Sequence, residues 1–489
     1  MVIGGGPAGS AIGRLLAGWG HSVLILTKLI DETRGLAESL PPSSRKPFAS
    51  LGVLDAIDRA GFCRTTGNTV WWGSREGRVE HFGTPDGETG FQVFRPELDR
   101  LLLESARDAG ASVCVGATVR RVRLDGEVAL VEYESAGLPA RVTCRFAIDC
   151  SGRAGLIARQ GFRRYEPRYG MQAFIGVWNR EGGWDLPDET HTVVETFEDG
   201  WAWSVPISRH TRHVVVMVDG TKTRLSRGPT LESTYRAELA KAKQLDALRS
   251  GALLQHTWAC DASLYSSSVY GDSNFLLVGD AGSFIDPLSS FGVKKALASA
   301  SVGAVTVHTC LRHRDREALA LQFFSALERQ MFTSNLRRSR EYAREACRRH
   351  PHPFWASRAD ADVEEWSEEP DEDAAARSPD VQSAFRMLKE SPALALVFAG
   401  GARLEKRALI RGREIVLEDA VALPGVRVAV RFFAVVDLLT LAEMAAHFRQ
   451  VPDLFEAYCR SQPAVPLPDF LLGLSLLVAK GILTPRTQA

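Results

Sequence analysis

The chain lacks an excess of charge of either sign, because its 59 Lys and Arg balance its 59 Asp and Glu to a formal net charge of zero. Nucleic acids and anionic membranes are bound through basic surfaces, so neither is expected as a partner. There is no run of about 18 apolar residues and no basic segment with an apolar core at the start. We therefore expect a soluble, unprocessed, cytoplasmic protein.

Cysteine spacings typical of metal or redox sites are also missing. The eight cysteines are scattered without any C-x-x-C pair. This pattern favours reduced, structural thiols in a cytosolic compartment, and no metal site is expected. What the chain does have is size, since 489 residues that are 45% apolar are enough for two or three domains.

A glycine-rich turn opens the sequence, which begins MVIGGGPAGSAIGRLL. Gly4, Gly6 and Gly9 fit the pattern G-x-G-x-x-G between a short apolar strand and a helical pattern, and a second strand is expected at residues 22–26. In such a turn one glycine makes the bend, one lets a pyrophosphate approach the backbone, and one lets helix and strand pack closely. The order of strand, turn, helix and strand predicts a dinucleotide site.

Two details of this first unit depart from the usual pattern. The second strand ends in Thr27 and Lys28, where an acidic residue is usual, and a hydroxyl binds a ribose more weakly than a carboxylate does. Because few residues precede the first glycine, we expect the natural start to lie upstream.

A second strand and turn of this kind occurs much later, in LLVGDAGSFIDPLSSFGV at residues 276–293. A buried strand at 275–278 leads into Gly279-Asp280, and a Pro-containing turn reaches Gly292 at the expected start of a helix. That helix start would present free N–H groups and a positive dipole end to an electron-rich ring system. Two separated segments of this type indicate FAD rather than NAD.

Two further segments complete the framework. One places Arg95 just before an amphipathic helix that runs into a strand pair at 113–122. The other, RFAIDCSGRAGLIAR at 145–159, gives a strand ending at Asp149 and a Ser-Gly-Arg turn. Each alone is a common unit of helix and strand.

In this order the four segments resemble the superfamily of class A flavoprotein monooxygenases and flavin-dependent halogenases, over about residues 1–340. The resemblance implies an α/β fold, with a Rossmann-type, glutathione-reductase-like FAD-binding domain and an interleaved β-sheet substrate domain at about 60–95 and 165–265. It implies FAD as cofactor. Since no second G-x-G-x-x-G occurs, electrons are expected from NAD(P)H directly or through a partner flavin reductase.

The resemblance also implies which residues contact the cofactor. They are Gly4, Gly6, Ala8 and Gly9 at the pyrophosphate, Thr27 and Lys28 near the adenosine ribose, Val119 near the adenine, Arg95 near the flavin side, Asp280 at the ribityl or pyrophosphate region, and the backbone of Phe291, Gly292 and Val293 facing the isoalloxazine.

Another match concerns the halogenases in particular. The segment Trp201-Ala202-Trp203-Ser204-Val205-Pro206 resembles their W-x-W-x-I-P element. Alternating aromatic residues on a strand that faces a core would give the same pattern. Relatives that do not halogenate carry the element too, so it marks ancestry rather than activity.

In this superfamily a flavin hydroperoxide gives its oxygen either to an aromatic ring or to a halide. Halogenases hold the resulting hypohalous acid with a lysine, but the corresponding stretch at 66–74 has none, and no lysine occurs between Lys46 and Lys222. Tryptophan halogenases also carry a Glu where this chain has Ser289. Hydroxylation of an electron-rich aromatic ring is therefore favoured, and halogenation is the alternative.

The expected substrate pocket is aromatic. No His, Asp or Glu stands out as a base, since an Asp before Pro, as at Asp286, typically makes a turn. Ordinary core packing is the alternative for every pocket candidate. The candidates are Trp71, Trp72, Phe174, Trp201, Trp203 and Phe284, together with Ser289, Ser290 and Phe291 as residues at the site of catalysis.

Beyond residue 340 the resemblance fades. A basic helix gives way to an acidic stretch, and residues 341–380 are predicted to be a charged linker. Residues 381–489 are predicted to form a small C-terminal domain with strands at 413–423 and 427–436 and helices at 438–448 and 469–483. Its pattern resembles winged-helix-type modules that bind peptides for modification, and a capping or dimerisation element is the alternative.

A peptide-binding module would make the substrate an aromatic side chain within a polypeptide. The combination resembles flavin monooxygenases that hydroxylate a peptidyl tryptophan when the tryptophylquinone cofactor of quinohemoprotein amine dehydrogenase matures. Two other functions stay open: a FAD-binding docking or chaperone protein without catalysis, and an NADPH-driven flavin reductase or saturase.

Overall fold

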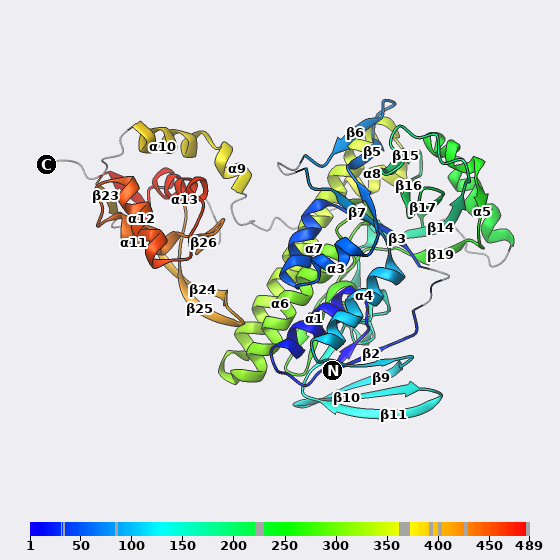
Figure 1. Ribbon diagram of the computed structural model, residues 1–489, viewed down its shortest axis with the longest axis horizontal. Helices are drawn as coiled ribbons and strands as arrows, with labels where there is room; N and C mark the ends of the chain where they lie inside the picture. Colours follow the sequence, from blue (N-terminus) through cyan, green and yellow to red (C-terminus); the bar gives the residue numbers. More distant parts are fainter. Residues whose placement is uncertain are drawn as a thin grey trace. The chain divides into compact units, whose positions relative to one another are not determined.

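The computed structural model describes residues 1–30, 32, 35–83, 87–220, 229–360, 372–390, 395–399, 403–424 and 429–485. The chain divides into two compact units, Met1–Glu364 and Glu365–Ala489. Figure 1 labels helices and strands of each unit.

A six-stranded sheet with the order β21-β22-β12-β1-β2-β8 forms the base of the first unit. All its neighbouring strands run parallel except the edge strand β21. The three central strands are almost wholly buried, as expected for a parallel sheet that is covered on both faces. The strands are β1 (Val2–Ile3), β2 (Leu24–Thr27), β8 (Ser112–Val115), β12 (Ala147–Asp149), β21 (Gly271–Asp272) and β22 (Phe275–Leu277).

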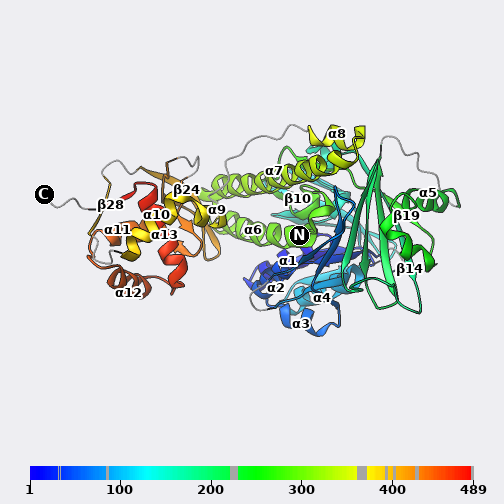
Figure 2. The same ribbon diagram turned by 90° about the horizontal axis from the view of Figure 1, so that it is seen from above.

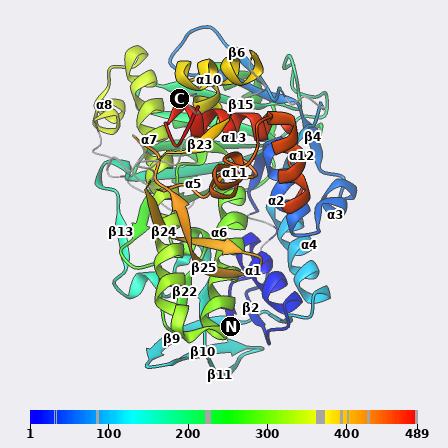
Figure 3. The same cartoon turned by 90° about the vertical axis from the view of Figure 1, so that its left-hand side faces the viewer.

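Helices and a small antiparallel sheet cover this parallel sheet. The helices α1 (Pro7–Gly18), α4 (Arg95–Asp108) and α6 (Gly292–Arg312) lie side by side (Figures 1 and 3). The strands β9 (Thr118–Asp125), β10 (Val128–Ser135) and β11 (Leu138–Cys144) pack apolar side chains against β1, β12 and β22. This is the predicted α/β, Rossmann-type class, and it is confirmed.

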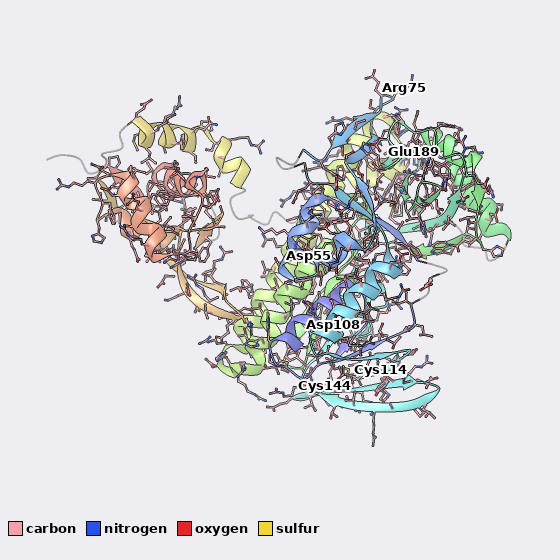
Figure 4. The ribbon with its side chains drawn as sticks, in the orientation of Figure 1. Asp55, Arg75, Asp108, Cys114, Cys144 and Glu189 are labelled. Carbon is pink, nitrogen blue, oxygen red and sulfur yellow. The ribbon has the colours of Figure 1, made fainter. Side chains whose placement is uncertain are left out.

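Figure 4 labels Cys114 on β8 and Cys144 at the end of β11. The Cys114 thiol lies 3.5 Å from the Ser135 hydroxyl, and the Cys144 thiol donates to the Ala129 carbonyl. All eight cysteines of the chain are free.

A second, larger sheet has the order β18-β14-β17-β16-β15-β5-β6, with β19 paired to β14 (Figure 2). One of its faces packs against α5 (Pro229–Leu239), and the other faces the cavity described below. The strands are β5 (Gly67–Trp71), β6 (Arg78–His81), β14 (Met171–Asn179), β15 (Thr192–Phe197), β16 (Gly200–Pro206), β17 (Thr211–Asp219), β18 (Ala252–Leu253) and β19 (Trp258–Asp261).

Short elements join the two sheets. The strands β3 (Ala37–Leu40), β4 (Cys63–Thr65) and β7 (Gly90–Phe94) form a three-stranded sheet, and β13 (Arg163–Tyr165) pairs with β20 (Tyr265–Ser267). The short helices α2 (Arg45–Ser50) and α3 (Leu54–Arg59) lie between β3 and β4 in the sequence.

The charged linker predicted to begin at residue 341 is wrong for its first part. Helix α7 (Glu317–Arg349) continues through it, and α8 (Pro353–Ala359) follows. Phe354 and Trp355 are buried, and the Trp355 indole N–H donates to the Phe197 carbonyl at 2.9 Å. The physical reason is that these two aromatic side chains anchor the segment on the larger sheet, so that it packs rather than forming a solvated linker. Residues 361–371 of the acidic stretch lie outside the described residues.

The second unit has its own apolar core. The predicted strand at 413–423 is β25 (Glu414–Val421), which pairs with β24 (Leu404–Arg411). Of the strand predicted at 427–436, only β26 (Phe432–Phe433) and the first residue of β27 (Val436–Asp437) are found among the described residues. The helices are α9 (Glu372–Arg377), α10 (Pro379–Glu390), α11 (Leu438–Ala445), α12 (Val451–Ser461) and α13 (Leu467–Ala479), and β23 (Leu396–Phe398) pairs with β28 (Leu483–Pro485).

In the described part of the chain, none of the helices has both the length and the apolar character required to span a membrane.

Candidate functional site

A cavity of about 710 Å³ lies in the first unit and is lined by residues of both large sheets. Its volume is typical of small-molecule and cofactor sites. The parallel sheet and its loops contribute the glycine turn and the loop at 280–293, whereas the larger sheet contributes an aromatic wall.

The glycine turn is shaped by close backbone packing. Gly4 has a φ of +105°, and its N–H donates to the Leu26 carbonyl at 2.8 Å. A Cβ on Gly9 would lie 1.8 Å from the Gly4 carbonyl oxygen, so only glycine fits at that position. A Cβ on Gly6 would meet nothing nearer than 3.9 Å, because this residue faces the cavity. The start of α1, which no side chain caps, is therefore open to an anion.

The end of β2 lies beside this turn. Thr27 is 8% exposed, and a Cβ on Gly5 would lie 2.8 Å from its hydroxyl oxygen. Ala8, Thr27, Lys28 and Val119 all line the cavity. The residues predicted for the pyrophosphate, ribose and adenine are thus brought together, except that Gly9 packs behind Gly4 rather than lining the cavity.

Arg95 lines the cavity with both of its charge partners in place. Its guanidinium bonds Glu38 at 2.5 Å and Asp99 at 3.0 and 3.1 Å. Burial disfavours the charged form, but the carboxylates of Asp99 and Glu38 outweigh that effect and raise the pKa of Arg95 above its ordinary value. A permanent cation is therefore fixed between two carboxylates at the start of α4.

The turn after β22 is held by a buried lysine that no sequence motif indicates. Lys295 on α6 is 2% exposed, donates to the Ser283 carbonyl, and places its ammonium 3.4 Å from a carboxylate oxygen of Asp280. Asp280 lines the cavity, and its carbonyl accepts from the Tyr265 hydroxyl at 2.6 Å. Lys295 follows Lys294 near the start of α6, a pattern that is typical of exposed lysines. The sequence signal for burial is that α6 is apolar on nearly all sides.

A second buried charge lies below the same turn. Glu328 on α7 is 2% exposed, and burial raises its pKa while the nearby Lys295 ammonium partly opposes that rise. Its carboxyl bonds the Ser299 hydroxyl, whose oxygen accepts from the Gly279 N–H at 2.9 Å. One lysine and one glutamate therefore brace the Gly279-Asp280 turn from the protein interior.

The loop that precedes α6 contains the three predicted catalytic candidates, of which the structure brings one to the cavity. Ser290 lines it and has a φ of +50°, a left-handed conformation that costs energy for a residue other than glycine. Ser289 donates to the Asp286 carbonyl at 3.0 Å and is not part of the lining. Phe291 instead packs against a hydrophobic cluster that includes Phe332 and Leu336. Gly292 and Val293, which are predicted to contact the cofactor, line the cavity.

Asp286 does more than make a turn. Its carboxylate accepts from the Leu288 N–H at 3.1 Å, which is the turn expected before Pro287. The side chain is also 8% exposed and lines the cavity, and burial raises its pKa to about 6. The pattern Asp-Pro gave no sign of this second property, because burial depends on the packing of α7 and α8.

The aromatic wall consists of residues from β16, β19 and the loop after β22. Trp201 and Trp203 stack with ring centroids 4.6 Å apart, and both line the cavity. Phe284 lies in the lining with Arg153 over its ring at 5.0 Å. Trp258 and Arg153 had not been assigned to the pocket from the sequence, although the Ser-Gly-Arg turn that carries Arg153 had been noticed.

Three other pocket candidates do not reach the cavity. Trp72 lies behind Trp201, with centroids 6.0 Å apart, and its indole N–H donates to the Tyr342 carbonyl. Trp71 and Phe174 pack on the opposite face of the sheet. For Trp71 and Phe174 the reason is strand alternation, because neighbouring residues of a strand point to opposite faces, whereas Trp201 separates Trp72 from the cavity.

The residues present fit FAD. The uncapped start of α1 and the open side of Gly6 suit a pyrophosphate, and the cavity continues to the start of α6 and the aromatic wall. A family model described as an FAD binding domain matches residues 1–320. The chain belongs to this FAD-binding family.

Curated relatives of this FAD-binding protein include halogenases. A tryptophan 2-halogenase of Chondromyces crocatus is 32% identical over 336 residues, which are 66% of this chain and 63% of that protein. A 1H-pyrrole-2-carbonyl-[peptidyl-carrier protein] chlorinase of Pseudomonas fluorescens is 26% identical over 64% of this chain and 76% of its own length. The chain thus spans less than two thirds of the tryptophan 2-halogenase.

Solved structures share the fold of this FAD-binding protein. The flavin-dependent halogenase CmlS superposes with a TM-score of 0.75 at 23% identity, over 99% of this chain and 95% of that one. The peptidyl tryptophan dihydroxylase QhpG, described as essential for tryptophylquinone cofactor biogenesis, has a TM-score of 0.69 at 21% identity, over 98% of each chain. The predicted membership of the flavin-dependent halogenase and monooxygenase superfamily is confirmed.

Proposed function

We propose that this FAD-binding protein is a monooxygenase that hydroxylates an electron-rich aromatic ring. The observation that carries the proposal is the composition of the cavity. Its aromatic wall contains Trp201, Trp203 and Trp258, while the lysine among the described lining residues is Lys28, which follows β2 beside the glycine turn. The wall therefore has no ammonium group of the kind with which halogenases hold hypohalous acid.

The lining supports the cofactor contacts of this proposal. Gly4, Gly6 and Ala8 would hold the FAD pyrophosphate, Thr27 and Lys28 the ribose, and Asp280 the ribityl region. Val119 would lie at the adenine, and the backbone of Gly292 and Val293 would face the flavin ring. Reduced FAD supplies activated oxygen when bound.

The protein then has to hold the substrate ring and keep water out. The stacked pair Trp201 and Trp203 offers an apolar face for an aromatic ring, since offset or edge-to-face ring pairs contribute about 0.5–1.5 kcal/mol beyond area burial. Ser290, in its left-handed conformation, lines the cavity near the start of α6.

We propose a tryptophan side chain within a polypeptide as the substrate. Support comes from the fold that the chain shares over both units with the peptidyl tryptophan dihydroxylase QhpG. In this proposal the second unit binds the polypeptide, and electrons reach the flavin from NAD(P)H or a partner reductase.

Halogenation is the second candidate. The specific observation in its favour is that the curated relatives named above are a halogenase and a chlorinase, one of which is 32% identical to this chain. The retained Trp201-x-Trp203 element is consistent with either reaction.

Mass spectrometry tests the proposal. The FAD-loaded full chain is supplied with NADH, a flavin reductase, oxygen, chloride and a set of tryptophan peptides and free indoles. The proposal predicts a product heavier by one or two oxygen atoms. The variant Trp203→Ala should reduce its formation at least tenfold more than the matched variant Trp71→Ala, whose side chain lies on the other face of the same sheet. A chlorinated product would support the second candidate, and no product with any of these substrates would contradict both.

A further inference from the structure

Two cations from separate elements lie over the Phe291 ring beside the start of α6, and a third cation, Lys46, acts on one of them. The Lys294 ammonium lies 4.8 Å from the centroid of the Phe291 ring, and the Arg338 guanidinium on α7 lies 5.5 Å from it. The Lys294 ammonium also donates to the Ser43 hydroxyl at 3.2 Å, just before α2. Lys46 on α2 is close enough for its charge to act on Lys294.

Among the described residues, the nearby Glu38 carboxylate is bonded to Arg95 rather than to this cluster. In the part of the chain that the structure describes, Lys46, Lys294 and Arg338 form no ion pair. Burial, together with the charges of Arg338 and Lys46, lowers the pKa of Lys294. Arg95 differs, because it is held between two carboxylates.

Such a group of like charges opposes folding unless something else requires it. The chain has as many acidic as basic residues, so the unpaired charges of the cluster do not result from a shortage of carboxylates in the sequence. Violations of local charge balance in folded proteins concentrate at functional sites. The cluster is therefore more suited to an external anion than to stabilising the fold.

Its position connects the cluster to the cavity. Ser290 and Gly292, the two residues on either side of Phe291, both line the cavity. A group held by Lys294 is thus only a few bonds along the backbone from the loop at which the flavin contacts were predicted.

We propose that Lys46, Lys294 and Arg338, with the Ser43 hydroxyl, form a binding site for the phosphate or carboxylate group of a small molecule that enters the cavity. Arg338 can bond two oxygens at once, lysines add point charges, and the serine hydroxyl adds a neutral donor. Two sources carry this chemistry: the pyrophosphate of NAD(P)H and the acid group of an aromatic substrate. The aromatic source rests on the proposed function, and the dinucleotide source does not.

Calorimetric titration of the FAD-loaded full chain with inorganic pyrophosphate tests the site. Charge-assisted hydrogen bonds contribute about 1.5–3 kcal/mol, so Lys294→Met and Arg338→Met should each weaken pyrophosphate binding about tenfold or more. Arg59→Met is the matched control, because Arg59 is an exposed cation on α3 and its loss changes the net charge equally. Equal affinities for the control and the two cluster variants would overturn the proposal.

Two further titrations with the same variants identify the source of the anion. A selective loss of NADPH affinity assigns the site to the electron donor. A selective loss of affinity for indole-3-acetate, with none for its neutral amide, assigns it to the substrate. If neither ligand is affected, the site does not serve a molecule that enters the cavity and the proposal fails. Absence of any hydroxylated product would contradict the proposed function but leave the pyrophosphate result intact.

Discussion

Replacing Lys295 by Met should lower the stability of the fold and weaken FAD binding, because both depend on the buried Lys295 ammonium. The ammonium is 2% exposed, bonds the Ser283 carbonyl, and lies 3.4 Å from the Asp280 carboxylate. Met has a similar volume but no charge, so Asp280 and the buried Glu328 would both lose their cation. Removing one partner of a buried ion pair costs about 3–5 kcal/mol, against a total stability of about 5–15 kcal/mol for a domain.

The loss of stability in Lys295→Met depends on Glu328, and a double variant separates the contribution of Glu328. Since burial already raises the pKa of Glu328, loss of the ammonium would raise it further and the carboxyl would take up a proton. Lys295→Met combined with Glu328→Gln removes both charges, and neutral replacement of a buried pair is often nearly neutral for stability. We therefore expect the double variant to be more stable than Lys295→Met alone.

Two assays measure these effects. Chemical unfolding of the FAD-free chain gives the change in stability, and fluorescence titration with FAD gives the dissociation constant. If Lys295 positions Asp280, its replacement should weaken FAD binding about tenfold in the wild-type background but hardly at all when Asp280 is already Asn. Equal effects in both backgrounds would refute the positioning role, and a stability change below about 1 kcal/mol would refute the buried charge pair.

Three other predictions concern the glycine turn and two buried titratable groups. Gly9→Ala should abolish FAD retention, because its Cβ would lie 1.8 Å from the Gly4 carbonyl oxygen, whereas Gly18→Ala, where nothing lies within 4 Å, should retain FAD in gel filtration. Burial raises the pKa of Asp286 to about 6, so the protonated carboxyl stabilises the fold at low pH. About 3 kcal/mol of unfolding free energy is lost as the pH rises from about 4 to 6, and Asp286→Asn should remove that loss in urea unfolding. Burial lowers the pKa of His213 to about 4, so charging it should destabilise the fold by about 3 kcal/mol as the pH falls from about 6.5 to 4; unfolding curves of His213→Phe that keep this slope would contradict the assignment.

The framework for the cofactor was predictable because short backbone motifs determine it locally. The turn at Gly4 and the Gly279-Asp280 segment each have a sequence pattern that follows from steric contact or from the dipole of a helix start. The structure places both at one cavity although they lie at opposite ends of the family match.

The substrate end was less predictable, because it depends on which face of a strand each side chain takes. Trp71 and Trp72 are neighbours, so at most one of them could face the cavity, and pattern alone did not show that Trp72 would lie behind Trp201. Lys295 and Asp286 were missed for a related reason. Their burial is created by α7 and α8, which approach from distant parts of the chain.

Helix α8 shows how composition can mislead. It directly precedes the acidic stretch and falls within the predicted linker, yet the burial of Phe354 and Trp355 fixes it on the larger sheet. Each of these two aromatic side chains buries about 150–250 Å². Their burial stabilises the packed position of α8 more than the neighbouring solvated charges destabilise it.

The central claim is that the cavity directs oxygen, rather than a halogen, to an aromatic ring. The most direct test supplies the FAD-loaded full chain with reduced flavin, isotopically heavy oxygen gas, excess bromide and a tryptophan peptide, and records the mass spectrum of the peptide. The account predicts incorporation of one or two heavy oxygen atoms on the tryptophan and no bromine isotope pattern. A brominated peptide without incorporated oxygen would contradict it.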